Sequence, residues 1–149
     1  MKILYIIPAR GGSKGLPGKN TRLLGKDPMI AHTILAAQNS AFKGTVLVTT
    51  DDEAIAAIAI KYKAEVPFVR PDNLATDTAG TMDVIFHAIN FYKEKNILFD
   101  LIVLLQPTSP LRTAEDIDNA MRLMTEKNAG AVVSVCEAEH HPLWSNTLP

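Results

Sequence analysis

The sequence has almost none of the material from which disulfide-linked or cysteine–zinc domains are built. Cys136 is the only cysteine in 149 residues. One cysteine can form neither an intrachain disulfide nor a cysteine zinc cluster, and such a composition fits a reducing cytosol. We expect Cys136 to fill space in the hydrophobic core.

The sequence also lacks an excess of charge and any long apolar run. It has 15 Lys and Arg residues against 16 Asp and Glu residues, a formal net charge of −1, and therefore no global basic field for nucleic acid or a membrane surface. No run approaches the roughly 20 apolar residues of a membrane-spanning helix. The N-terminal run 3–7 is cut off by Pro8 and Arg10 and is too short for a signal peptide. These absences predict a cytoplasmic protein that binds neither nucleic acid nor membrane.

Apolar residues are nevertheless plentiful, at 47% of the chain, which is enough for one globular domain with a real core. Continuous runs rich in Val, Ile and Leu are typical of strands covered on both faces. These runs span residues 2–7, 45–50, 100–106 and 131–138. A shorter segment, 65–70, contains Pro67, which cannot donate to a strand ladder, so we expect an edge strand there.

Between these runs, apolar residues recur at the spacing of one helix face. The predicted helices cover residues 28–40, 55–62, 81–95 and 117–124. Thr50 with Glu53, and Thr113 with Asp116, have the spacing of a capping box. Strands that alternate with helices predict an α/β fold, a three-layer, doubly wound and mostly parallel sheet. Ligands of such sheets bind outside the carboxyl ends of the strands.

A glycine-rich loop, PARGGSKGLPGKN at residues 8–20, follows the first predicted strand. Its glycines let backbone N–H groups approach a ligand, and Arg10, Lys14 and Lys19 supply positive charge, so the loop fits a polyphosphate. The spacing of Gly12 and Gly18 excludes the P-loop, and the dinucleotide motif G-x-G-x-x-G does not occur. The alternative is a flexible surface turn.

Four sequence blocks in order resemble the CMP-sugar synthetases, the acylneuraminate cytidylyltransferase family. They are PARGGSKGLPGKN at 8–20, RPDNLATDTAGT at 70–81, LLQPTSPLRT at 104–113 and EHHPLW at 139–144. The resemblance implies a Rossmann-like nucleotidyltransferase fold over residues 1–149. It also implies transfer of CMP from CTP to the anomeric hydroxyl of an acidic keto sugar, with release of pyrophosphate, Mg²⁺ as the cofactor and a homodimer.

The resemblance also implies roles for individual residues. Arg10 and Lys19 would be catalytic, stabilising the charge of the departing pyrophosphate. The implied CTP-binding residues are Arg10, Gly11, Gly12, Ser13, Lys14, Lys19, Asn20, Arg70, Ala79 and Thr81. The implied sugar-acid-binding residues are Gln106, Thr108 and Ser109.

Two of these assignments have a plainer alternative. Arg70 could be a solvated charge at a strand end. The turn that contains Ser109 and Arg112 could be only a helix-entry turn that ends in the Thr113 cap. The Gln106-Pro107-Thr108 sequence differs from the Gln-Gly-Asp of relatives that activate deoxyoctulosonate, and it therefore favours a sialic acid-type nine-carbon acid.

Two sets of residues raise the question of a metal. Asp51 and Asp52 could ligate one, but we expect them to serve the N-terminus of the following helix. The adjacent His140 and His141 make a poor zinc chelate. The resemblance places the magnesium ligands, part of the sugar pocket and the dimer contacts in a C-terminal part that this chain lacks, so the metal ligands are unknown.

Family members are typically half as long again as this chain, so the resemblance predicts a truncated chain. It leaves open a nucleotide-binding module without catalysis, or a cytidylyltransferase for another acid: legionaminate, pseudaminate or deoxyoctulosonate. A third alternative is a nucleotidyltransferase for a sugar 1-phosphate, against which the Gln106-Pro107-Thr108 block and the Lys19-Asn20 ending argue.

Overall fold

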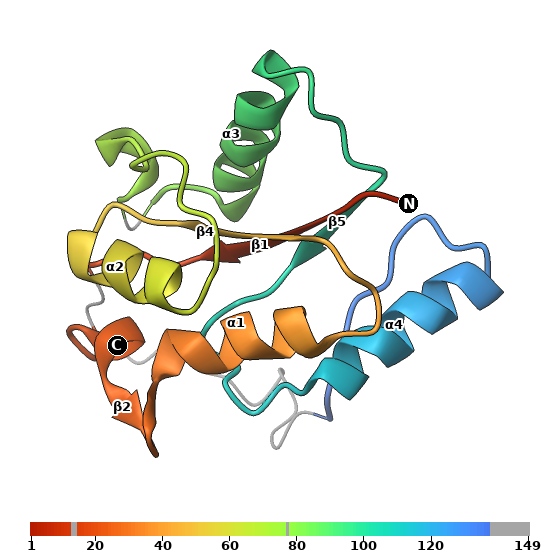
Figure 1. Cartoon of the computed structure of the whole chain (residues 1–149), viewed down its shortest axis with the longest axis horizontal. Coiled ribbons are helices and arrows are strands. Elements are labelled where there is room, and N and C mark those ends of the chain that lie inside the picture. Colours follow the sequence, from red (N-terminus) through yellow and green to blue (C-terminus); the bar gives the residue numbers. More distant parts are fainter. Residues whose placement is uncertain (13–14, 77, 138–149) are drawn as a thin grey trace, which may run out of the picture. The chain divides into compact units, whose positions relative to one another are not determined.

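The computed structural model describes residues 1–12, 15–76 and 78–137. Among these residues, the main sheet has three parallel strands in the order β4–β1–β5 (Figure 1). The strands are β1 (Ile3–Pro8), β4 (Thr45–Thr49) and β5 (Leu101–Leu104). Leu4 pairs with Thr45 on one side and with Ile102 on the other. The central strand is buried on both faces, as its continuous apolar run predicted.

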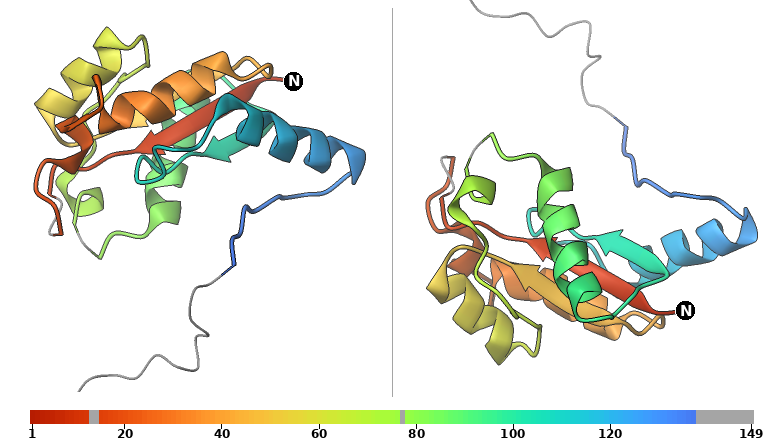
Figure 2. Two further views of the ribbon diagram at one scale, coloured as in Figure 1. Left: turned by 90° about the horizontal axis from the view of Figure 1, so that it is seen from below. Right: turned by 90° about the horizontal axis from the view of Figure 1, so that it is seen from above.

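Four α-helices within the described part accompany the sheet: α1 (Met29–Asn39), α2 (Glu53–Lys61), α3 (Thr81–Glu94) and α4 (Ala114–Glu126). Figures 1 and 2 show α1 on one face of the sheet and α3 on the opposite face, and α2 packs beside α1. The predicted three-layer α/β fold is confirmed.

Short elements complete the fold. Two 3₁₀ turns were not predicted: η1 (Lys19–Thr21) and η2 (Asp72–Leu74). A small hairpin was not predicted either; it pairs two strands of two residues each, β2 (Leu23–Leu24) and β3 (Asp27–Pro28). Such short pieces bury few side chains, so they leave no hydrophobic period in the sequence.

The core between the sheet and α3 is built from both elements. Leu4, Ile6 and Leu47 of the sheet are buried against Ala88 and Tyr92 of α3. The Tyr92 hydroxyl donates to Glu65 Oε2 (2.6 Å), and burial together with this bond raises the pKa of the Tyr92 phenol. The phenol therefore stays protonated and keeps donating throughout the physiological pH range.

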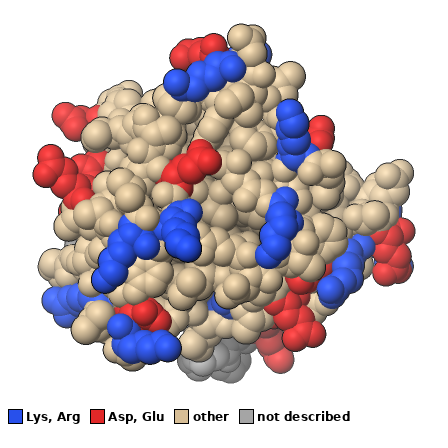
Figure 3. Space-filling view, viewed as in Figure 1, with Lys and Arg blue, Asp and Glu red and all other residues tan. Residues whose placement is uncertain are grey.

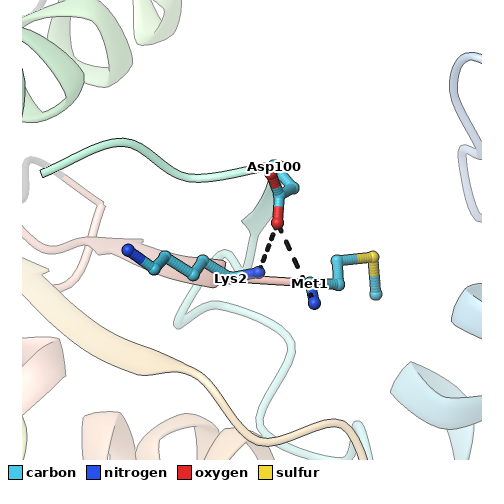
Figure 4. A network of polar contacts seen from close by, with 3 residues as sticks. All are labelled: Met1, Lys2 and Asp100. Carbon is cyan, nitrogen blue, oxygen red and sulfur yellow. Dashed lines mark hydrogen bonds and ion pairs between the residues drawn. The ribbon is translucent and has the colours of Figure 1, made fainter.

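The N-terminus is tied to the start of β5 (Figure 4). The Lys2 backbone N–H donates to Asp100 Oδ2 (2.6 Å), and the Met1 ammonium group lies 3.9 Å from the same oxygen. The Asp100 N–H in turn donates to the Lys2 carbonyl oxygen (2.8 Å). These bonds fix the register of β1 and β5, which run in parallel toward the carboxyl end of the sheet.

The segments predicted as further strands differ from the expectation. Residues 65–70 contribute a single parallel bridge, from Glu65 to Leu47, and form no full edge strand. The prediction of a buried strand at 131–138 is wrong for residues 131–137, where Val133 and Val135 are 80% and 90% exposed. An apolar run becomes a strand only where a neighbouring strand satisfies its backbone, and none of the described strands pairs with this segment. Cys136 is likewise exposed and does not fill core space.

One predicted helix cap is confirmed and the other is wrong. Thr113 and Asp116 form the capping box at α4: the Thr113 N–H donates to Asp116 Oδ2 (2.8 Å), and the Asp116 N–H donates to Thr113 Oγ1 (3.2 Å). At α2 the cap is Asp52, whose Oδ1 accepts from the Ile55 N–H (3.0 Å). Thr50 instead accepts from the Asp52 N–H (3.1 Å) and so shapes the turn before the cap.

The described chain divides into compact units, residues 1–118 and a second unit that begins at Asn119. Figure 3 shows acidic and basic side chains interspersed over the face it presents, in keeping with the near-zero net charge. Of the helices in the described ranges, none has the length and apolar character needed to cross a membrane.

Candidate active site

The carboxyl edge of the sheet carries a cavity of about 320 Å³. It lies wholly within the first unit, and its walls come from the segments that follow β1 and β5, from η1, and from α3 with the segment before it. The lining residues are Pro8, Arg10, Lys19, Asn20, Arg70, Leu74, Thr76, Ala79, Thr81, Val84, Gln106, Pro107 and Thr108. Three blocks that are distant in sequence therefore meet at one site, as expected for this edge of a parallel sheet.

Arg70 forms a buried cationic part of the wall, with only 4% of its surface exposed. Its Nε donates to Thr49 Oγ1 (3.2 Å), and its Nη2 donates to the Thr49 carbonyl oxygen. Burial lowers the pKa of Arg70, an effect that Asp51 opposes and Arg10 reinforces, but a guanidinium remains charged at neutral pH. The alternative of a solvated charge at a strand end is therefore wrong.

Asn20 forms a second buried part of the wall, at 3% exposure. Its Nδ2 donates to the Arg10 carbonyl oxygen (3.2 Å), whereas its Oδ1 has no hydrogen-bond partner among the described residues. An unsatisfied buried acceptor is costly. The residue is held in the wall by its amide N–H, while its oxygen stays buried behind the surface of the cavity.

The backbone around this wall is shaped by glycines. Gly18 precedes η1 with φ of +65°, a left-handed conformation that favours glycine, and it turns the chain so that Lys19 and Asn20 face the cavity. Gly11 donates its N–H to Asp51 Oδ1 (3.1 Å), and a Cβ added to it would lie 2.6 Å from Asp52 Oδ2. The first part of the loop is thus packed closely against the segment after β4.

The part of the wall after β5 is more open. Gln106 and Thr108 line the cavity, but both residues are exposed overall. Arg112 donates from Nη1 and Nη2 to the Gln106 carbonyl oxygen, at 3.3 Å each, and the Ser109 N–H donates to the same oxygen (3.3 Å). Burial lowers the pKa of Arg112, and Asp116 opposes this effect. Arg112 and Ser109 therefore brace the turn, which leaves the Gln106 side chain to the cavity.

The profile of the Cytidylyltransferase family matches residues 4–143 of this chain. The chain belongs to the cytidylyltransferase family. It is 44% identical over 149 residues to CMP-N,N'-diacetyllegionaminic acid synthase of Legionella pneumophila, with 99% of this chain and 63% of the relative covered. It is also 44% identical over 135 residues to N-acylneuraminate cytidylyltransferase of Escherichia coli, with 90% and 31% covered. The resemblance drawn from the four sequence blocks is confirmed, and the chain spans less than two thirds of the length of these relatives.

The fold is shared with a solved structure, that of CMP:2-keto-3-deoxy-manno-octonic acid synthetase complexed with CTP. The TM-score is 0.71 at 24% identity, with 87% of this chain and 49% of the other chain covered. At this identity the likeness concerns the fold alone.

Most of the site residues predicted from the sequence are brought together. Those that line the cavity are Arg10, Lys19, Asn20, Arg70, Ala79, Thr81, Gln106 and Thr108. Gly11, Gly12 and Ser109 are not among the lining residues, and Ser13 and Lys14 lie outside the described residues. Gly11 supports the wall from behind through its bond to Asp51.

Sequence reasoning missed several lining residues of the cavity: Pro8, Leu74, Thr76, Val84 and Pro107. Thr76 lies inside the 70–81 block and Pro107 follows Gln106, so proximity to the recognised motifs could have indicated both. Leu74 and Val84 are ordinary apolar residues, and only packing places them at a ligand site.

The described residues also bear on the candidate metal ligands. They include no group of three or more His, Cys, Asp or Glu side chains that could hold an ion. Asp52 caps α2, as expected, but Asp51 accepts from Gly11 instead of serving the helix. His140 and His141 lie outside the described residues.

Proposed function

We propose that the protein transfers CMP from CTP to the anomeric hydroxyl of a sialic acid-type nine-carbon keto sugar acid. The observation that carries this proposal is the meeting of Arg10, Lys19 and Arg70 with Gln106 in one cavity. Relatives 44% identical to this chain carry the names of diacetyllegionaminic acid and N-acylneuraminate, which supports an acid of this class.

In the proposed step, the anomeric oxygen of the acid attacks the α-phosphorus of CTP. A new P–O bond forms, the bond to the β-phosphate oxygen breaks, the hydroxyl proton is released, and pyrophosphate leaves. Phosphoryl transfer depends mainly on positioning and charge stabilisation, so cations beside the departing pyrophosphate lower the barrier. Arg10 and Lys19 supply that charge, and Gln106 and Thr108 orient the acid.

Asn20 supports this site through the Arg10 backbone. Its Nδ2 donates to the Arg10 carbonyl oxygen (3.2 Å) from a buried position. Asn20 therefore helps to hold in place the arginine that binds the triphosphate.

Magnesium and a homodimer remain predictions from the family resemblance. Bound magnesium would neutralise charge on the triphosphate, but no described side chains gather to hold it.

Calorimetric titration with CTP, ATP, GTP and UTP tests the nucleotide assignment. We expect CTP to bind most tightly and Arg10→Ala to weaken it by about tenfold or more, because a cation that contacts phosphate is lost. Arg122→Ala is the matched control, since Arg122 lies on α4 and is not among the cavity-lining residues. Equal affinity for all four nucleotides would contradict the assignment.

A pyrophosphate-release assay tests the acid. N-acetylneuraminate, diacetyllegionaminate, pseudaminate and deoxyoctulosonate are compared at saturating CTP and Mg²⁺, and we expect release with at least one nine-carbon acid. Release only with deoxyoctulosonate would refute the choice of class. CTP binding without release in any mixture would favour the nucleotide-binding module.

A further inference from the structure

The short segment 49–52 runs from the last residue of β4 to the N-cap of α2. Its groups hold several parts of the cavity wall. The Thr49 carbonyl oxygen accepts from the Ala9 N–H (3.0 Å) and from Arg70, and the Thr50 carbonyl oxygen accepts from the Arg70 N–H (2.8 Å). The four residues of the segment, 49–52, are not among the residues that line the cavity. The segment therefore acts behind the wall, on the residues that face the ligand.

Asp51 makes the contact with the loop after β1. Its Oδ1 accepts from the Gly11 N–H at 3.1 Å, across 40 residues of sequence, in a part-buried position. Gly11 directly follows Arg10, so this bond fixes the peptide from which the Arg10 side chain extends. The fit is close, because a Cβ on Gly11 would lie 2.6 Å from Asp52 Oδ2.

Asp51 also acts electrostatically on Arg70, a buried cation of the cavity wall. The positive charge of Arg70 is attracted by Asp51 and repelled by Arg10. A carboxylate in this position has opposite effects on a polyanion: its hydrogen bond places the loop, while its charge opposes the phosphates. These effects can be separated by substitution, because asparagine keeps the acceptor and loses the charge.

We propose that Asp51 is a positioning residue of the nucleotide site, which holds the Arg10–Gly11 peptide in place through its hydrogen bond to the Gly11 N–H. It acts through Arg10 and does not touch the ligand. This inference rests on the proposed function, since CTP is the ligand that the positioned arginine would bind.

The test compares variants that keep either the geometry or the charge. Asp51→Asn keeps an acceptor at the same place, and Asp51→Glu keeps the charge but moves it by one methylene group. We expect Asp51→Asn to bind CTP within about threefold of the parent or more tightly, and Asp51→Glu and Asp51→Ala to bind about tenfold more weakly. Asp52→Asn is the matched control, because it removes an adjacent charge while asparagine remains a good helix cap.

Hydrogen exchange at the Gly11 amide, measured without nucleotide, is a readout that a general loss of stability would not reproduce. We expect exchange to accelerate about tenfold at Gly11 in Asp51→Glu and Asp51→Ala, with little change in Asp51→Asn and in the β1 amides of every variant. In an assay of pyrophosphate release, the same variants should raise KM for CTP more than they lower kcat.

The outcomes separate this inference from the proposed function. CTP affinity retained in Asp51→Glu but lost in Asp51→Asn would overturn the inference, because charge and not geometry would then matter. Unchanged Gly11 exchange in Asp51→Glu would overturn it as well. If the parent protein binds no CTP, the proposed function fails, and the role in CTP binding fails with it. If Asp51→Ala does not fold, the Asn and Glu pair still decides.

Discussion

The cavity wall has two parts that differ in how firmly they are built. In the first part, Arg70 and Asn20 are 4% and 3% exposed and are held by hydrogen bonds to Thr49 and to the Arg10 backbone. In the second part, Gln106 and Thr108 are exposed residues of the turn after β5. The buried wall therefore has its charge in place before a ligand arrives, as electrostatic stabilisation of a polyanion requires. The open wall is suited to selecting among related acids, because exposed side chains can be exchanged with little effect on folding.

Arg70→Ala should have the largest effect, because it removes both the charge and the support of the buried wall. We expect the free energy of unfolding, measured by urea denaturation, to fall by about 2 kcal/mol, the value of hydrogen bonds from a charged donor. CTP affinity should fall by more than about tenfold. Arg70→Lys should recover only part of each loss, because lysine cannot make the two-point contact to Thr49. An Arg70→Ala protein of unchanged stability would show that the wall is not preorganised.

Gln106→Ala should act on the acid alone. We expect KM for the keto acid to rise about tenfold, with CTP affinity unchanged within about twofold, because the Gln106 backbone still accepts from Arg112 and the turn is retained. Thr108 and Ser109 offer a matched pair of hydroxyls, since Thr108 lines the cavity and Ser109 does not. Thr108→Ala should raise KM for the acid and Ser109→Ala should not; equal effects would contradict the assigned wall.

The smallest effect is expected at Asp116, in the capping box behind the open wall. Hydrogen bonds from the Thr113 backbone and side chain lower the pKa of Asp116, so its ionised form is favoured in the folded protein. Its contribution to stability is therefore complete above the ordinary pKa of an aspartate and is lost as the pH falls through the lowered value. Melting temperatures of Asp116→Asn and the parent should differ more at pH 7 than at pH 3. A difference that does not shrink on acidification would contradict this account of the cap.

Much of the fold could be predicted because it depends on local patterns. The runs at 2–7, 45–50 and 100–106 became β1, β4 and β5, as continuous apolar runs predict. β1 and β4 are mostly buried, whereas β5 is only partly buried. The run at 131–138 has the same composition, yet residues 131–137 form no strand. An apolar composition shows only that a segment could be buried as a strand. The segment becomes a strand when a neighbouring strand pairs with its backbone.

The candidate site was predictable to the extent that its residues lie in recognisable blocks. Arg10, Asn20, Arg70 and Gln106 were all named from the sequence, and the structure places them around one cavity. Leu74 and Val84 were not, because an apolar residue in a ligand wall has the same local pattern as one in the core.

The sequence by itself determined the order of the three strands and four helices along the chain, the end of the sheet at which the cavity lies, and the glycines and cations of the loop after β1. These properties follow from hydrophobic periodicity, glycine content and charge, which are local. The tertiary structure decided that Arg70 is buried, that Asn20 keeps an unpartnered acceptor, and that Asp52 caps a helix while Asp51 binds Gly11. Such contacts join residues far apart in the chain, and they form only after packing has brought the ends of the strands together.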